Sequence, residues 1–178
     1  MKRIKLKSPI TLFFCAMCIF AYLIGTPDAF VLGSSNMFSM VLWIFGHKTF
    51  SHLTNNLMFI LILGPIIEDR YDSSIFITLI IITALLTATL HILLFDYGLL
   101  GASGIVFMMI VLSAAGTKNG EIPLTFILVI LVFIGKEFIS SIKPGQVSYF
   151  AHIIGGLLGG LFGLLIPKTK DGYIKNIN

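Results

Sequence analysis

The sequence predicts an all-α polytopic membrane protein with six transmembrane helices. Hydrophobic residues make up 57% of the 178 residues and charged residues only 11%, whereas soluble domains have roughly 45–50% and 25%. Apolar runs recur between charged or turn-forming breaks, at residues 8–25, 52–67, 74–95, 103–117, 122–142 and 146–167. A helix needs about 20 apolar residues to cross the hydrocarbon core of a bilayer, and most of the runs are near that length. We therefore expect one membrane domain over residues 1–178.

The composition excludes several other classes of protein. The two cysteines, Cys15 and Cys18, both lie inside the first apolar run, so a disulfide-stapled secreted scaffold is excluded. The 12 lysines and arginines are not clustered in any motif that binds nucleic acid, so no nucleic-acid partner is expected. Membrane lipid is the expected surrounding of the chain.

Basic residues predict the orientation of the chain, because lysine and arginine are enriched on the cytoplasmic side of membrane proteins. With six spans both termini lie on one side. The tails and the loops after the second and fourth spans hold nine of the 12 basic residues, and the other side holds Lys48, Lys136 and Lys143. We therefore expect a multi-pass protein of the cell membrane with both termini in the cytoplasm, and the Ile, Lys, Asn and Phe content favours a bacterial source.

The first run follows a cluster of basic residues, as in a signal peptide, but no cleavage site follows it, so we expect an uncleaved helix. The stretch 26–51 that comes next is uncharged from Phe38 to Phe45, and it is too short and too flanked by turns to cross the membrane. We expect a partly membrane-embedded loop between helices 1 and 2, with Trp43 near the depth of the lipid headgroups.

Three polar residues mark the start of the second run. His52 and Asn56 are four residues apart, so they share one face of the helix, and His47 lies five residues earlier. Polar and ionisable side chains within a span are costly, which indicates a function. The alternative is that these side chains only cap and hydrate the start of the helix.

The fourth run is too short to cross the membrane, because residues 103–117 rise roughly 22 Å as a helix. Lys118 fixes the cytoplasmic end, so the end that begins at Ser103 must lie inside the membrane. Ser103 stands between Gly101 and Gly104, and these glycines permit a tight loop. Free N–H groups at a helix start also favour a developing anion.

The sixth run places a histidine on a face of small residues. His152 shares this face with Gly155 and Gly159, and small residues permit another helix to approach closely. On the fourth run Ala114 lies on the face of Ser103, so the two helices can pack with Ser103 and His152 facing each other.

This set of residues suits acyl transfer, with Ser103 as nucleophile, His152 as general base and a His/Asn pair as donors to the oxyanion. No acidic residue lies within a span at the depth of His152, so we expect a Ser–His dyad, with Asp96 as the nearest candidate for a third member. The chain has no His-Glu-x-x-His motif, and its histidines have no cysteine or carboxylate at ligand spacing, so neither a metal nor another cofactor is expected.

These residues resemble the motifs of the rhomboid family of intramembrane serine proteases. The matching residues are Gly101, Ser103 and Gly104 for Gly-x-Ser-Gly, His47, His52 and Asn56 for His-x4-His-x3-Asn, and His152, Gly155 and Gly159 for the motif of the sixth helix.

The resemblance implies a rhomboid-like six-helix fold and a serine endopeptidase. It implies that Ser103 is the nucleophile and His152 the general base. The backbone N–H of Ser103 would form the oxyanion hole with His52 and Asn56, and His47 would support the cavity. The implied substrates are single-span transmembrane proteins, cut near the outer membrane face.

Phe107 stands where many members carry a tyrosine under the catalytic histidine, so the ring is kept and the hydroxyl is lost. The resemblance also implies that the fifth span and the loop over residues 136–145 form a mobile gate and cap. Two other functions remain open, a small transporter and a non-catalytic protein of the same fold that binds transmembrane helices. His91, on the third run, is expected to be a structural histidine with its hydrogen bonds satisfied.

Overall fold

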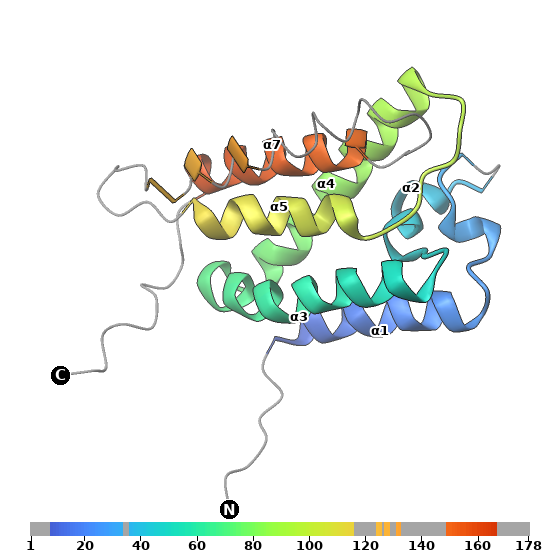
Figure 1. Ribbon diagram of the computed structural model, residues 1–178, viewed down its shortest axis with the longest axis horizontal. Helices are drawn as coiled ribbons and strands as arrows, with labels where there is room; N and C mark the ends of the chain where they lie inside the picture. Colours follow the sequence, from blue (N-terminus) through green and yellow to red (C-terminus); the bar gives the residue numbers. More distant parts are fainter. Residues whose placement is uncertain are drawn as a thin grey trace, which may run out of the picture.

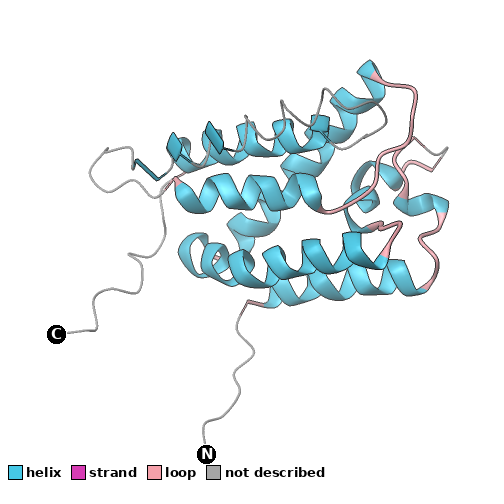
Figure 2. Ribbon diagram, viewed as in Figure 1, coloured by secondary structure: helices cyan, strands magenta, loops and turns pink. Residues whose placement is uncertain are grey.

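The computed structural model describes residues 8–33, 36–115, 124–125, 127–128, 131–132 and 149–166. Within these residues the chain is helical, and the only strand-like pairing is one bridge between Leu32 and Leu99. The main helices pack as a bundle, with most connecting loops at one end and the start of α1 and the end of α7 at the other (Figure 1, Figure 2). They are α1 (Pro9–Leu23), α3 (Phe50–Tyr71), α4 (Ser73–Leu94), α5 (Ser103–Ala114) and α7 (Tyr149–Leu165).

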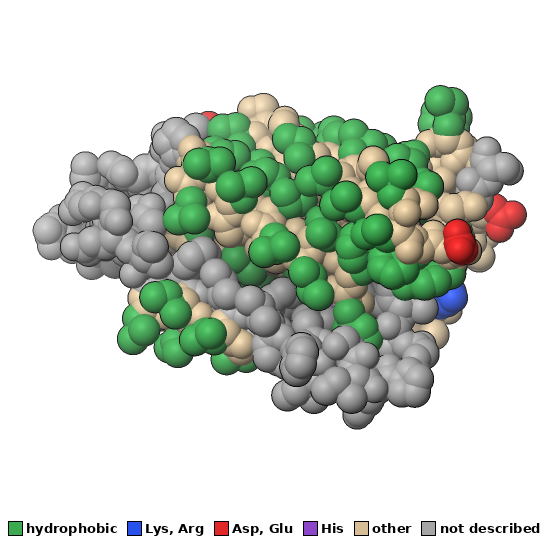
Figure 3. Space-filling view, turned by 90° about the horizontal axis from the view of Figure 1, so that it is seen from above, with side chains coloured by type: hydrophobic (Ala, Val, Ile, Leu, Met, Phe, Trp, Pro, Cys, Tyr) green, Lys and Arg blue, Asp and Glu red, His purple; other side chains and the backbone are tan. Residues whose placement is uncertain are grey.

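These helices correspond to five of the six predicted runs, whereas the predicted helix 122–142 lies largely outside the described residues. By length and composition α3 and α4, with 22 residues each, can cross a membrane, and α1, α5 and α7 are shorter apolar helices. Hydrophobic side chains cover much of the described surface (Figure 3). Soluble proteins rarely expose apolar surface on this scale, which agrees with a bundle that faces lipid.

The stretch between α1 and α3 folds onto the bundle. It contains a 3-10 turn at Asp28–Phe30, the short helix α2 (Ser39–Leu42) and a second 3-10 turn at Trp43–Phe45. Trp43 is 1% exposed, and its indole N–H donates to the carbonyl of Ala84 in α4 at 3.3 Å. Trp43 is therefore buried within the protein, and its position near headgroup depth stays a prediction. A hydrogen-bond acceptor within the protein satisfies the indole, so the ring packs inside the bundle.

Glu68 joins the ends of three helices at the end of the bundle where α1 begins. Its carboxylate accepts hydrogen bonds from the backbone N–H groups of Ile10 and Thr11 at 3.0 and 3.1 Å and from the hydroxyls of Thr11 and Ser73 at 2.9 and 2.6 Å. The N–H groups at a helix start have no partner within the helix and carry a partial positive charge. A carboxylate that caps them holds α1 against α3 and the start of α4.

The packing of α7 on α5 depends on small residues. A Cβ atom at Gly155 would collide with the carbonyl oxygen of Gly104, and one at Gly159 would collide with the carbonyl oxygen of Met108. The two helix backbones are therefore in direct contact, and Figure 1 shows α5 and α7 side by side. The predicted pairing of the fourth and sixth apolar runs through a glycine face is confirmed.

Candidate active site

The N-terminus of α3 presents His52. The Thr49 hydroxyl accepts a hydrogen bond from the backbone N–H of His52 at 3.1 Å, which satisfies one of the free N–H groups at the helix start. The ring of His52 lies edge-on to the ring of His47, with 4.8 Å between their centroids. The rings of the two histidines are therefore in contact. They lie at the end of the bundle that holds most of the connecting loops, which we call the looped end.

His47 orients the amide of Asn56. The Nδ1 atom of His47 lies 2.9 Å from the carbonyl oxygen of Phe45, and a carbonyl can only accept, so Nδ1 carries the hydrogen. The other ring nitrogen, Nε2, then accepts from the Asn56 amide at 3.0 Å. Both side chains are buried, and burial lowers the pKa of His47 from 6.5 to about 4. His47 is therefore neutral near pH 7, which keeps Nε2 available as the acceptor.

Gly101 brings the loop before Ser103 against His52. Its backbone has φ of +125°, a conformation that glycine adopts readily. A Cβ atom at this position would lie 2.7 Å from Cε1 and 2.9 Å from Nε2 of His52. The Gly101 N–H also donates to the carbonyl of Trp43 at 2.9 Å. The loop is thus held between the start of α3 and the stretch that precedes it.

The starts of α5 and α7 are also in contact. A Cβ atom at Gly104 would lie 3.1 Å from the carbonyl oxygen of Ala151. Ser103 directly precedes Gly104 and His152 directly follows Ala151. The structure therefore brings the backbones that carry Ser103 and His152 together at the looped end of the bundle. Both side chains are partly exposed.

Phe107 lies beneath the imidazole of His152. The two ring centroids are 4.3 Å apart and the planes are inclined by 37°. Phe107 is four residues after Ser103, so both lie on the same face of α5. The imidazole of His152 is therefore directed to the face of α5 that carries Ser103.

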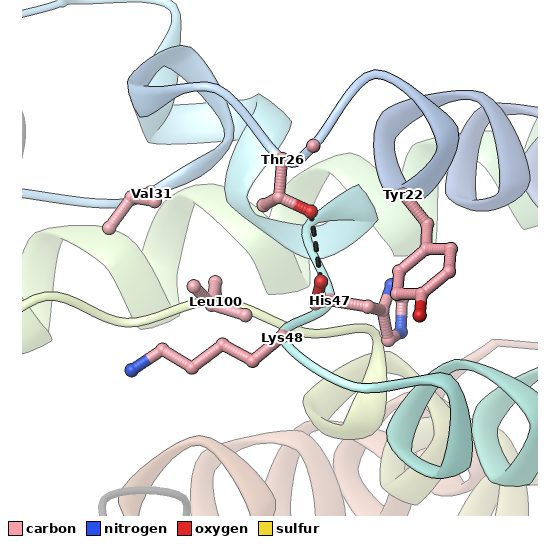
Figure 4. Close-up of a pocket in the computed structure, with 7 residues that line it drawn as sticks. Tyr22, Thr26, Val31, His47, Lys48 and Leu100 are labelled. Carbon is pink, nitrogen blue, oxygen red and sulfur yellow. Dashed lines mark hydrogen bonds between the residues drawn. The ribbon is translucent and has the colours of Figure 1, made fainter.

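A cavity of about 460 Å³ lies beside His47, between the end of α1, the stretch before α3 and the loop before α5 (Figure 4). Its wall includes an exposed lysine side chain, Lys48, as well as apolar groups. The hydroxyl of Thr26 closes one side by donating to the carbonyl of His47 at 2.9 Å. The lining residues are Tyr22, Gly25, Thr26, Val31, His47, Lys48 and Leu100.

The structure brings His47, His52 and Asn56 close to the loop before Ser103, and it brings the first turns of α5 and α7 together. Gly159 lies further along α7, against Met108 of α5. Sequence reasoning missed Tyr22, Thr26 and Lys48 of the cavity wall, and no motif marks them, because the wall is assembled from distant segments. Among the described residues no three His, Cys, Asp or Glu side chains are grouped to hold a metal ion.

Known proteins are similar to the part of the chain that carries the candidate site. The family model of the Rhomboid domain matches residues 34–169, a range that includes every predicted site residue. The chain is also 24% identical over 182 residues to the rhomboid protease GlpG of Haemophilus influenzae. That alignment covers 93% of this chain and 95% of the relative.

Proposed function

Because the chain belongs to the rhomboid family, we propose that it is an intramembrane serine protease that uses Ser103 and His152 as a catalytic dyad. Membership of this family implies a polytopic, all-α membrane fold. The observation that carries the proposal is the contact between Gly104 and Ala151, which places Ser103 and His152 on two touching backbones.

The reaction follows from the chemistry of the two side chains. The Oγ atom of Ser103 attacks the carbonyl carbon of the scissile peptide bond while His152 takes the hydroxyl proton. The tetrahedral intermediate collapses when His152 gives this proton to the leaving amine, and an acyl ester remains on Ser103. Water then attacks the ester while His152 takes its proton, and the proton passes to Ser103 as the carboxylic acid product leaves.

The oxyanion of the intermediate is stabilised by the backbone N–H of Ser103 and by His52 and Asn56. Two contacts support this assignment. The ring of His52 lies against Gly101, two residues before Ser103, and the amide of Asn56 is held by His47. An amide nitrogen has two hydrogens, so one remains for the oxyanion after the bond to His47 is made. Donors that are fixed before the reaction stabilise the developing charge without reorganisation.

The substrates are single-span transmembrane proteins, and the cut falls near the outer membrane face. Both termini of the protease lie in the cytoplasm, residues 1–178 form a single domain, and no cofactor takes part. The cavity beside His47 receives a side chain of the substrate near the scissile bond. Its mixture of apolar walls with one lysine suits a polypeptide segment that leaves the membrane.

Cleavage of a model single-span substrate by the purified protein in detergent tests the proposal. We expect Ser103→Ala to abolish cleavage, because the nucleophile is removed. Ser113→Ala is the matched control, since Ser113 lies on the same helix and donates only to the carbonyl of Ile110 at 2.8 Å. Residual turnover in Ser103→Ala, at a level near that of Ser113→Ala, would exclude the dyad.

A further inference from the structure

A cluster of four aromatic rings joins three segments at the looped end of the bundle. His91 contributes from the last turn of α4, Phe95 and Tyr97 from the following loop, and Phe150 from the first turn of α7. The His91 ring lies 5.1 Å from Phe95, 5.2 Å from Tyr97 and 6.1 Å from Phe150. Phe95 and Phe150 also contact each other, at 5.1 Å. We call these four residues the His91 cluster.

His91 makes one specific hydrogen bond within this cluster. Its Nε2 atom donates to the carbonyl oxygen of Tyr97 at 2.7 Å, since a carbonyl can only accept. The side chain is 1% exposed, and its Nδ1 atom is buried with no hydrogen-bond partner among the described residues. The expectation of a fully satisfied structural histidine was therefore wrong for one of the two nitrogens.

Packing alone does not explain a histidine at this position. A buried polar atom without a partner costs free energy, so an apolar ring would fill the same space at lower cost. What the imidazole adds over an apolar ring is the bond from Nε2 to the Tyr97 carbonyl. That bond fixes the backbone of the loop between α4 and α5.

This loop leads directly to Ser103. Two residues beyond Tyr97, the N–H of Leu99 donates to the carbonyl of Leu32 at 3.3 Å, and the N–H of Leu32 donates back at 2.8 Å. Two residues further, Gly101 is bonded to the carbonyl of Trp43. The backbone that ends at Ser103 is thus anchored at three successive points, and His91 provides the first.

The same cluster reaches His152 through α7. Phe150 precedes His152 by two residues, and two residues on a helix turn the direction by about 200°. Phe150 therefore faces the cluster while His152 faces Phe107 on α5. The rotation of α7 about its axis is set from both sides, by the His91 cluster and by Phe107.

We propose that His91 is a positioning residue that sets the geometry between Ser103 and His152, by holding the loop before Ser103 and the first turn of α7. The proposal rests on the proposed function, because it assumes that these two residues carry out the reaction. A misplacement of about 1 Å at a reacting centre can lower a rate roughly 100-fold, so a loss of this anchor is measurable.

Three variants of the full chain separate positioning from packing. His91→Gln keeps a donor that can reach the Tyr97 carbonyl, His91→Leu has a similar size without a donor, and His91→Phe keeps an aromatic ring. We expect the Leu and Phe variants to lose roughly 10- to 100-fold in kcat with KM nearly unchanged, while the Gln variant stays close to the parent. The melting temperature of His91→Phe should stay close to that of the parent, because the variant loses the bond to the Tyr97 carbonyl but also removes the unsatisfied Nδ1 atom.

The rate of reaction with a fluorophosphonate probe distinguishes the two roles. Positioning lowers the rate constant of Ser103 labelling while every molecule is labelled in the end. A purely structural role lowers the final extent of labelling and leaves the rate constant unchanged. The control is Thr89→Val, which removes a hydrogen bond from the exposed side of the same helix and should change neither quantity.

Two outcomes would overturn the proposal. The first is labelling of His91→Leu at the same rate as the parent, and the second is a loss of final extent in His91→Phe without a change in rate constant. If Ser103→Ala is inactive in the same assays, the proposed function stands and only the role of His91 fails. If Ser103→Ala retains full turnover, the dyad itself fails, and the positioning role fails with it.

Discussion

The ring of Phe107 lies 4.3 Å from the ring of His152, one helical turn beyond Ser103 on α5. This contact gives the imidazole a flat apolar support and limits the directions in which it can point. We expect Phe107→Tyr to retain turnover, because the ring is kept. We expect Phe107→Leu to lose about tenfold in kcat through misplacement of the base. Steady-state kinetics measure these kcat values, and melting temperatures check that the variants fold. Equal kcat values for the Leu variant and the parent would refute a supporting role of Phe107.

Asn56→Ala should lower turnover while the fold is kept. The loss of one oxyanion donor costs ~10²–10³ in kcat in well-studied serine proteases, and the remaining donors should preserve some activity. Asn55→Ala is the matched control, because Asn55 is the exposed neighbour of the buried Asn56. If Asn56→Ala and Asn55→Ala turn over substrate equally, Asn56 has only a structural role.

The stability of the protein should fall in mild acid through His47. Burial lowers the pKa of His47 from 6.5 to about 4, so between these pH values the unfolded chain binds a proton that the folded protein does not. The stabilisation is therefore complete above pH 6.5 and is lost as the pH falls toward 4. The loss is at most about 3 kcal/mol, since one unit of pKa corresponds to ~1.4 kcal/mol.

His47→Gln provides the comparison for this pH effect, because the amide does not titrate in the interval. His52, whose ring contacts His47, and the neighbouring Lys48 are present in both proteins. Melting temperatures across the interval from pH 6.5 to about 4 should fall more steeply for the parent than for the variant. Parallel curves would show that His47 does not contribute to the acid sensitivity.

Gly155→Ala should destabilise the protein and lower its activity together. Replacement of glycine by alanine within a helix normally stabilises it, by up to ~1 kcal/mol. At Gly155 the new methyl group would collide with the carbonyl of Gly104, next to Ser103. The helices must then separate next to Ser103 and His152, the proposed dyad. A melting temperature and kcat at or above the parental values would show that α5 and α7 do not need this close contact.

Much of the helical framework could be predicted from apolar periodicity, but one helix end could not. The predicted run over residues 52–67 stops before the charged residues Glu68, Asp69 and Arg70, whereas α3 continues to Tyr71. The continuation is possible because Glu68 caps the start of α1 and Arg70 donates to the carbonyl of Ser113 at 3.0 Å. These partners come from other helices, so nothing in the local sequence indicates them.

The candidate site was easier to predict than its supports. Ser103, His152 and the His/Asn pair lie in short motifs, and glycine spacing predicted which helices would meet. The bond between His47 and Asn56, the contact of Gly101 with His52 and the cavity wall depend on how distant segments pack. Such contacts follow from the tertiary structure and have no signal in a single sequence.

The most direct test of the Ser103–His152 dyad is to treat the protein in detergent with a fluorophosphonate probe and to identify the labelled residue by mass spectrometry of its peptides. We expect one labelled site, Ser103, and the loss of labelling in His152→Ala, because the serine hydroxyl reacts only when a base takes its proton. Labelling of a different serine, or undiminished labelling of Ser103 in His152→Ala, would contradict the Ser103–His152 dyad.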